Sequence, residues 1–70
     1  MNTYNIKGKA VKANTARAAA EAFAARSAKQ QGYGVLAIQS FARGECFEQF
    51  AVTNGVKGES YSYLLWVAFE

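Results

Sequence analysis

The sequence contains no histidine, no aspartate and no proline, and its only cysteine is Cys46. Without histidine there is no imidazole to act as a general base, to bind a metal or to activate a serine. A single cysteine cannot form an internal disulfide, and without histidine it does not make a conventional zinc site. We therefore expect a protein that is not an enzyme and that needs no cofactor or metal. We expect Cys46 itself to be a small, half-buried residue of a strand.

Targeting segments are also missing. No basic, then apolar, then small-residue segment marks a signal peptide at the N-terminus. The longest apolar run, residues 64–69, is far too short to span a bilayer. A lone cysteine fits a reducing compartment. These features predict a soluble protein of the cytoplasm.

Charge is sparse as well. The chain is 19% charged and 51% hydrophobic, which is typical of a folded domain, and its 70 residues are enough for one domain, residues 1–70. Five carboxylate side chains are too few for a mimic of DNA. The net charge of +3 permits contact with nucleic acid or with an acidic protein surface but requires neither.

The order of elements follows from periodicity and from helix-start signals. Residues 3–13 alternate between two faces, which predicts one strand with a basic face. Thr15 or its neighbour Asn14 can cap a helix over the alanine-rich residues 16–31, and Gly32 is suited to end it. Three further strands are predicted, with turns over residues 43–45 and 54–58, and they cover residues 33–43, 46–53 and 60–69.

These elements predict an α+β domain. One alanine-rich helix packs on a three- to four-stranded antiparallel sheet, in the order β-α-β-β-β. On the helix, Phe23 is the only large residue of the predicted buried face, and the other members of that face are Ala16, Ala19, Ala20 and Ser27. Strand order, and the sheet face that the helix covers, stay open.

Large apolar residues occur on both faces of the later strands. In the last strand Leu64, Trp66 and Ala68 point one way, and the alternate residues Tyr61, Tyr63, Leu65, Val67 and Phe69 point the other way. A single helix covers only one face, so the second face is predicted to bind a partner or a second copy of the chain. The alternative is a curled sheet whose aromatic residues cover one another.

Basic residues form the second candidate feature. Basic strand residues interleaved with aromatic residues can hold a nucleic-acid backbone and stack bases. The alternative is an ordinary solvated face, or lysines that protect an edge strand from aggregation. The candidate partner-binding residues are Lys7, Lys9, Lys12, Tyr33, Arg43, Phe47, Tyr61, Tyr63 and Trp66.

The opening residues Met1–Tyr4, the polar cap and alanine-rich helix of residues 15–28, and the aromatic strand Tyr61–Phe69 form an overall pattern. In size and element order the chain resembles the small phage-encoded anti-CRISPR proteins that block type I surveillance complexes. The resemblance implies a phage or mobile-element inhibitor in the cytoplasm of a bacterial host. Such a protein would dock on an RNA-guided complex and sterically prevent it from binding target DNA. No residue role carries over from the resemblance.

Two other functions stay open at this point. One is a small basic domain that binds nucleic acid directly, and its affinity would fall steeply with salt. The other is a structural or adaptor protein that forms a homodimer through its apolar sheet face. All three hypotheses describe binding without catalysis, with a protein, a ribonucleoprotein or nucleic acid as the partner and no role for a membrane.

Overall fold

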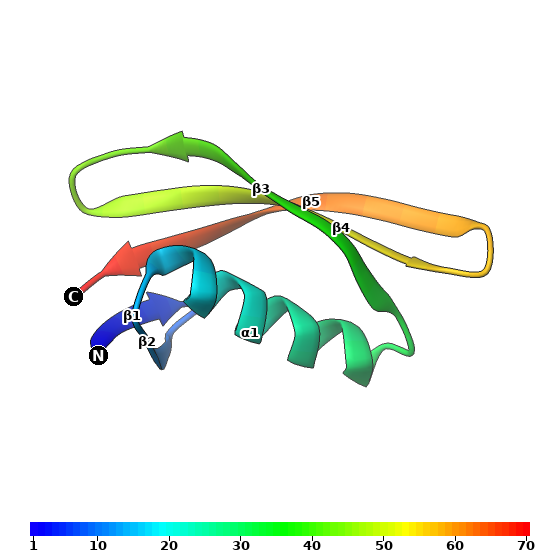
Figure 1. Ribbon diagram of the computed structural model, residues 1–70, viewed down its shortest axis with the longest axis horizontal. Helices are drawn as coiled ribbons and strands as arrows, with labels where there is room; N and C mark the ends of the chain where they lie inside the picture. Colours follow the sequence, from blue (N-terminus) through cyan, green and yellow to red (C-terminus); the bar gives the residue numbers. More distant parts are fainter.

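Five strands and one helix are arranged in two layers in the computed structural model, which describes residues 1–70. The antiparallel sheet has the strand order β2-β1-β5-β4-β3, and α1 packs on one of its faces (Figure 1). The α+β class and the antiparallel sheet are confirmed, whereas the predicted number of strands is wrong. The elements are β1 (Asn2–Ile6), β2 (Lys9–Ala13), α1 (Ala16–Gln30), β3 (Gly34–Arg43), β4 (Phe47–Val56) and β5 (Glu59–Phe69).

The extra strand comes from a tight turn at Lys7-Gly8. Both residues have positive φ, 53° and 82°, as a two-residue type I′ hairpin turn requires. This turn splits the predicted strand of residues 3–13 into β1 and β2, and the order becomes β-β-α-β-β-β. Apolar and polar residues alternate without a break across the turn, so periodicity alone gives no sign of it.

A second Lys-Gly turn joins β4 to β5. Lys57 and Gly58 have φ of 35° and 86°, while Asn54-Gly55, at the start of the predicted turn region 54–58, lies inside β4. Packing favours glycine at this position, because a Cβ would lie 3.0 Å from the backbone oxygen of Glu59 and 2.5 Å from Cδ1 of Leu36. The predicted region 54–58 therefore does contain a turn, but the turn consists only of its last two residues, Lys57 and Gly58.

The helix begins and ends as predicted. The hydroxyl of Thr15 accepts a hydrogen bond from the backbone N–H of Ala18 (3.0 Å). At the other end the backbone N–H of Tyr33 donates to the carbonyl of Ala28 (2.8 Å), and Gly32, with φ of 79°, donates to Lys29 (3.1 Å). This pair of bonds is a Schellman motif, which satisfies carbonyls that the helix end leaves free. The helix has 15 residues, and no helix here is long and apolar enough to cross a membrane.

The face of α1 that meets the sheet consists of alanine. Phe23 and Ser27, which were predicted to lie on this face, are only half-buried at its flank, so that part of the prediction is wrong. Small side chains let the helix approach the sheet closely, and the sheet supplies the bulk of the core. The buried helix residues are Ala16, Ala19, Ala20, Ala24 and Ala28, and the largest fully buried apolar sheet residues are Ile6, Phe50, Val52, Leu65 and Val67.

The close contact between helix and sheet predicts a difference between two identical substitutions on α1. Ala20 is fully buried, whereas Ala25 faces solvent. Ala20→Leu should destabilise the protein by about 1–3 kcal/mol, because the added atoms have no space against the sheet. Ala25→Leu is the matched control, and we expect a change within about 0.5 kcal/mol. Urea denaturation of both variants measures the difference, and equal stability of the two would contradict the packing described here.

Candidate functional site

The sheet face opposite α1 is not covered by any other part of the chain. Leu64 and Trp66 of β5 lie on this face and are 45% and 55% exposed, while the alternate residues Leu65 and Val67 are fully buried beneath α1. Strand β5 is the middle strand of the five, so Trp66 lies on the central strand of the open face, opposite Gln49 of β4. The predicted division of β5 into two apolar faces is therefore confirmed.

Neighbouring strands add two more apolar residues to this face. The ring of Phe47, at the start of β4, lies 4.8 Å from the ring of Trp66, centroid to centroid. Leu36 belongs to β3 and lies at an irregularity in its pairing with β4. Its side chain lies over Gly55 and is 65% exposed. We call Leu36, Phe47, Leu64 and Trp66 the open-face patch.

The part of the open face that β4 and β5 form carries no charge. The residues of β4 and β5 that alternate onto it carry no ionisable group, and the hydroxyls of Thr53 and Ser62 lie 2.9 Å apart there. An uncharged apolar centre with small polar groups beside it is the arrangement found at the core of protein–protein interfaces. The residues concerned are Phe47, Gln49, Ala51, Thr53 and Gly55 of β4 and Ser60, Ser62, Leu64, Trp66 and Ala68 of β5.

Three tyrosines that were candidate binding residues belong to the other side of the sheet. Tyr61 and Tyr63 share the face of β5 that α1 covers, and Tyr33 contacts Tyr61 edge-on at 5.4 Å. The amide of the buried Asn54 donates to the hydroxyl of Tyr61 (3.1 Å), which donates in turn to Oε1 of Gln31 (2.7 Å). This chain of hydrogen bonds fixes the C-terminal end of α1 to β4 and β5.

Removing the central hydroxyl tests the structural role of this chain. Tyr61→Phe should lower the free energy of unfolding by about 1–3 kcal/mol, because it leaves the buried Asn54 amide without its partner. Tyr33→Phe is the matched control, since the Tyr33 hydroxyl takes no part in the chain and only the ring contacts Tyr61. Denaturant unfolding measures both variants, and an unchanged stability of Tyr61→Phe would show that the chain contributes nothing.

Tyr63 is the one ionisable group whose pKa departs clearly from its ordinary value. Burial raises the pKa of its phenol above 10.0, the neighbouring Tyr61 raises it further, and the side chain of Asn54 opposes the increase. The folded state therefore prefers the neutral phenol. The ammonium of Lys7 lies 5.9 Å from the centre of the Tyr63 ring, so this candidate residue also packs on the tyrosine cluster.

The raised pKa of Tyr63 makes stability depend on alkaline pH. The folded protein holds this proton more tightly than the unfolded chain, so the contribution is complete below about pH 10 and is lost as pH rises through the folded pKa. Wild-type protein should lose stability more steeply than Tyr63→Phe above about pH 10. Denaturant unfolding across this range, with tyrosinate absorbance followed in parallel, tests the expectation. Identical slopes for the two proteins would contradict it.

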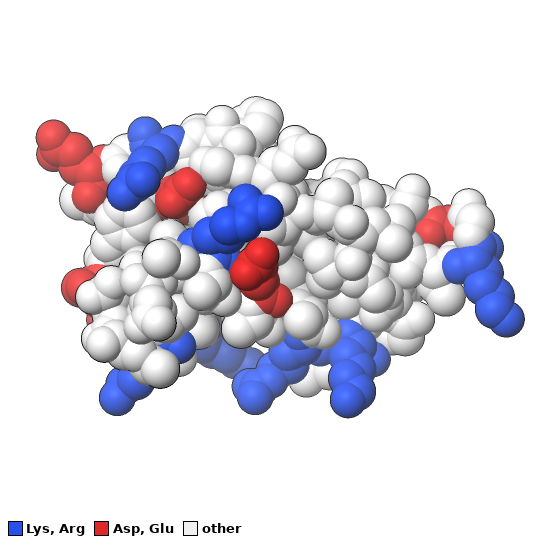
Figure 2. All heavy atoms as spheres, viewed as in Figure 1, with Lys and Arg blue, Asp and Glu red and all other residues white.

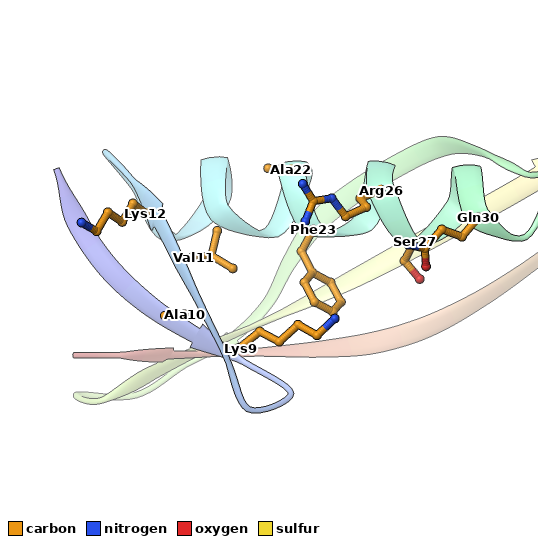
Figure 3. Close-up of a pocket in the computed structure, with 9 residues that line it drawn as sticks. All are labelled: Lys9, Ala10, Val11, Lys12, Ala22, Phe23, Arg26, Ser27 and Gln30. Carbon is orange, nitrogen blue, oxygen red and sulfur yellow. The ribbon is translucent and has the colours of Figure 1, made fainter.

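Basic residues collect along one edge of the molecule. Figure 2 shows a row of lysine and arginine side chains along its lower edge, where α1 and the β1–β2 hairpin lie. A groove of about 370 Å³ runs here between β2 and α1, and no carboxylate lines it. Phe23 and Val11 form its apolar part. The ammonium of Lys9 lies beside the Phe23 ring, the guanidinium of Arg26 lies over α1 above that ring, and Lys12 points away (Figure 3).

The structure thus separates the predicted candidates into distinct places. Lys9 and Lys12 flank the groove, where Arg26 and Phe23 join them although neither was a candidate. Arg43 lies apart, with its guanidinium 5.8 Å from the Phe69 ring, beside a hollow whose two arginines and two glutamates balance in charge. The three tyrosines and Lys7 form a cluster on the side of the sheet that α1 covers. Of the candidates, Phe47 and Trp66 lie on the open face, and Lys12 lies at its β2 edge, because its partner Thr3 shares a face with Asn5, the partner of Ala68.

Other kinds of site have little support in the arrangement of side chains. No three acidic or cysteine side chains come together in a way that could hold a metal ion. Cys46 is exposed in the turn before β4 instead of half-buried in a strand, which corrects the prediction. No protein-family model, no curated protein and no solved structure matches the chain. The case for function therefore depends on the open face and the basic groove.

Proposed function

We propose that this protein acts by binding another protein through the open-face patch. The observation that carries the proposal is the exposure of Trp66 on the central strand of an uncovered sheet face whose β4 and β5 residues carry no charge. Large aromatic residues at the centre of a patch supply most of the binding energy in many interfaces. Burying the exposed part of one such side chain contributes about 2 kcal/mol.

The charge of the face favours a protein partner over nucleic acid. Nucleic acid is held mainly through its phosphates, which need lysine or arginine at the binding surface. The β4 and β5 residues of the open face supply none. Aromatic stacking on Trp66 and Phe47 without cations beside them would give little affinity for a polyanion.

The specific form of the proposal is a phage-encoded inhibitor of a bacterial defence complex. In that role the patch docks on a protein subunit of a type I CRISPR surveillance complex and sterically keeps target DNA from pairing with the guide. An uncharged patch supports docking on the protein surface beside the DNA channel, because the channel itself is basic. No catalytic step is part of this mechanism.

Substitution in the patch tests the proposal directly. Trp66→Ser should weaken capture of a partner from bacterial lysate by about tenfold or more, because it removes the central aromatic residue. The control is Val56→Ser, which changes an exposed apolar residue at the β4–β5 turn, outside the patch. Capture is measured at high salt and with nuclease present, and DNA binding by a purified type I complex tests the specific form.

The outcomes separate the three binding functions. A partner held by wild type and by Val56→Ser but lost with Trp66→Ser supports the proposal. A sedimentation mass near twice 7.6 kDa that falls to one chain in Trp66→Ser would instead assign the patch to a homodimer. Recovery of nucleic acid alone, lost at high salt, would reject the proposal in favour of direct nucleic-acid binding.

A further inference from the structure

Strand β2 is an edge strand whose outer side has no neighbour in the sheet. It pairs with β1 in unbroken register, from Ile6 opposite Lys9 to Asn2 opposite Ala13. In an antiparallel pair that begins at a two-residue turn, the residues next to the turn bond to each other and the bonded pairs then alternate. The backbone N–H and C=O groups of Ala10 and Lys12 therefore point outward, away from β1.

The other edge of the sheet is a poorer template for a new strand. Strand β3 has two irregularities in its pairing with β4, between Val35 and Ala37 and between Ser40 and Ala42. Bulges of this kind bend an edge and interrupt the regular spacing of its free groups. Of the two edges, only β2 offers a regular row of donors and acceptors.

The groove between β2 and α1 lies along this regular edge. Ala10 and Lys12 line it from β2, and Phe23 and Arg26 line it from the helix. Figure 3 shows the Phe23 ring descending from α1 toward Lys9, with the guanidinium of Arg26 above it. An extended chain entering here would find backbone partners on one side, an aromatic surface on the other, and cations at two points.

We propose that the edge of β2 accepts an extended, acidic segment of a partner protein as a sixth strand. The outward groups of Ala10 and Lys12 would bind its backbone, Phe23 would contact an apolar side chain, and Lys9 and Arg26 would bind carboxylates. This site is separate from the open-face patch and does not depend on the function proposed for it.

Charge selects the occupant. The charged residues of β2 are both lysine, so a second copy of β2 or any basic strand is repelled at this edge. A nucleic-acid backbone would be attracted to Lys9 and Arg26, and its phosphates could accept from the free N–H groups of β2, but it has no regular row of donors for the free C=O groups. An acidic peptide uses both features of the site.

A labelled, end-blocked peptide with the repeat Glu-Thr-Val-Thr is the probe, because alternate residues of a strand share a face and this repeat can offer both glutamate and valine to the groove. Fluorescence anisotropy with full-length protein measures its binding. We expect Lys9→Gln combined with Arg26→Gln to weaken binding by about tenfold. Lys29→Gln is the matched control, because it removes a cation from α1 outside the groove, and it should change binding by less than about twofold. Trp66→Ser should leave binding unchanged, which separates this test from the test of the open face.

Modified probes test strand addition itself. A strand points its N–H groups alternately to its two edges. N-methylation of alternate peptide residues should therefore abolish binding in one of the two possible patterns and spare it in the other. Undiminished binding with both patterns would overturn strand addition. Equal binding of a lysine–valine peptide, or tighter binding of oligothymidine than of the acidic peptide, would overturn the acidic-segment proposal.

Discussion

The contact between a stripe of alanines and the sheet is the constraint on which the rest of this structure depends. Alanine side chains end at Cβ, so α1 lies close to the sheet, and residues such as Phe50 and Leu65 fill the core from the other side. A single helix of 15 residues covers one face of a five-stranded sheet and no more. The opposite face is therefore left to solvent or to a partner, and the helix leaves a groove beside β2.

The sequence predicts the elements best where local chemistry decides them. Thr15, the alanine-rich segment and Gly32 define the helix because capping and propensity act within a few residues. The Lys7-Gly8 turn was missed because alternation runs through it and lysine is an uncommon residue at positive φ. At Asn54-Gly55 the local signal predicts a turn that the structure does not have. This pair is common in turns, but here it lies inside β4, and Leu36 occupies the space above the glycine.

The two candidate surfaces differ in how much of them could be predicted. Alternation in β5 places Trp66 on one face of the strand and Tyr61 and Tyr63 on the other, and the structure confirms this division. The exposed apolar face could therefore be predicted from the two-residue period alone. The groove was not foreseeable. Its cations, Lys9 and Arg26, come from a strand that was not recognised as separate and from the flank of a helix whose buried stripe was predicted one position away.

The seam between β1 and β5 is much narrower than the other joins in the sheet. Two residue pairs, Tyr4 with Phe69 and Asn5 with Ala68, connect the β1–β2 hairpin to the three-stranded meander of β3, β4 and β5. The open-face patch lies entirely on the meander, whereas the groove is made by the hairpin and α1. The molecule is thus built from two units, the hairpin and the meander, that share one helix. A partner that binds both surfaces at once would stabilise the short β1–β5 junction between them.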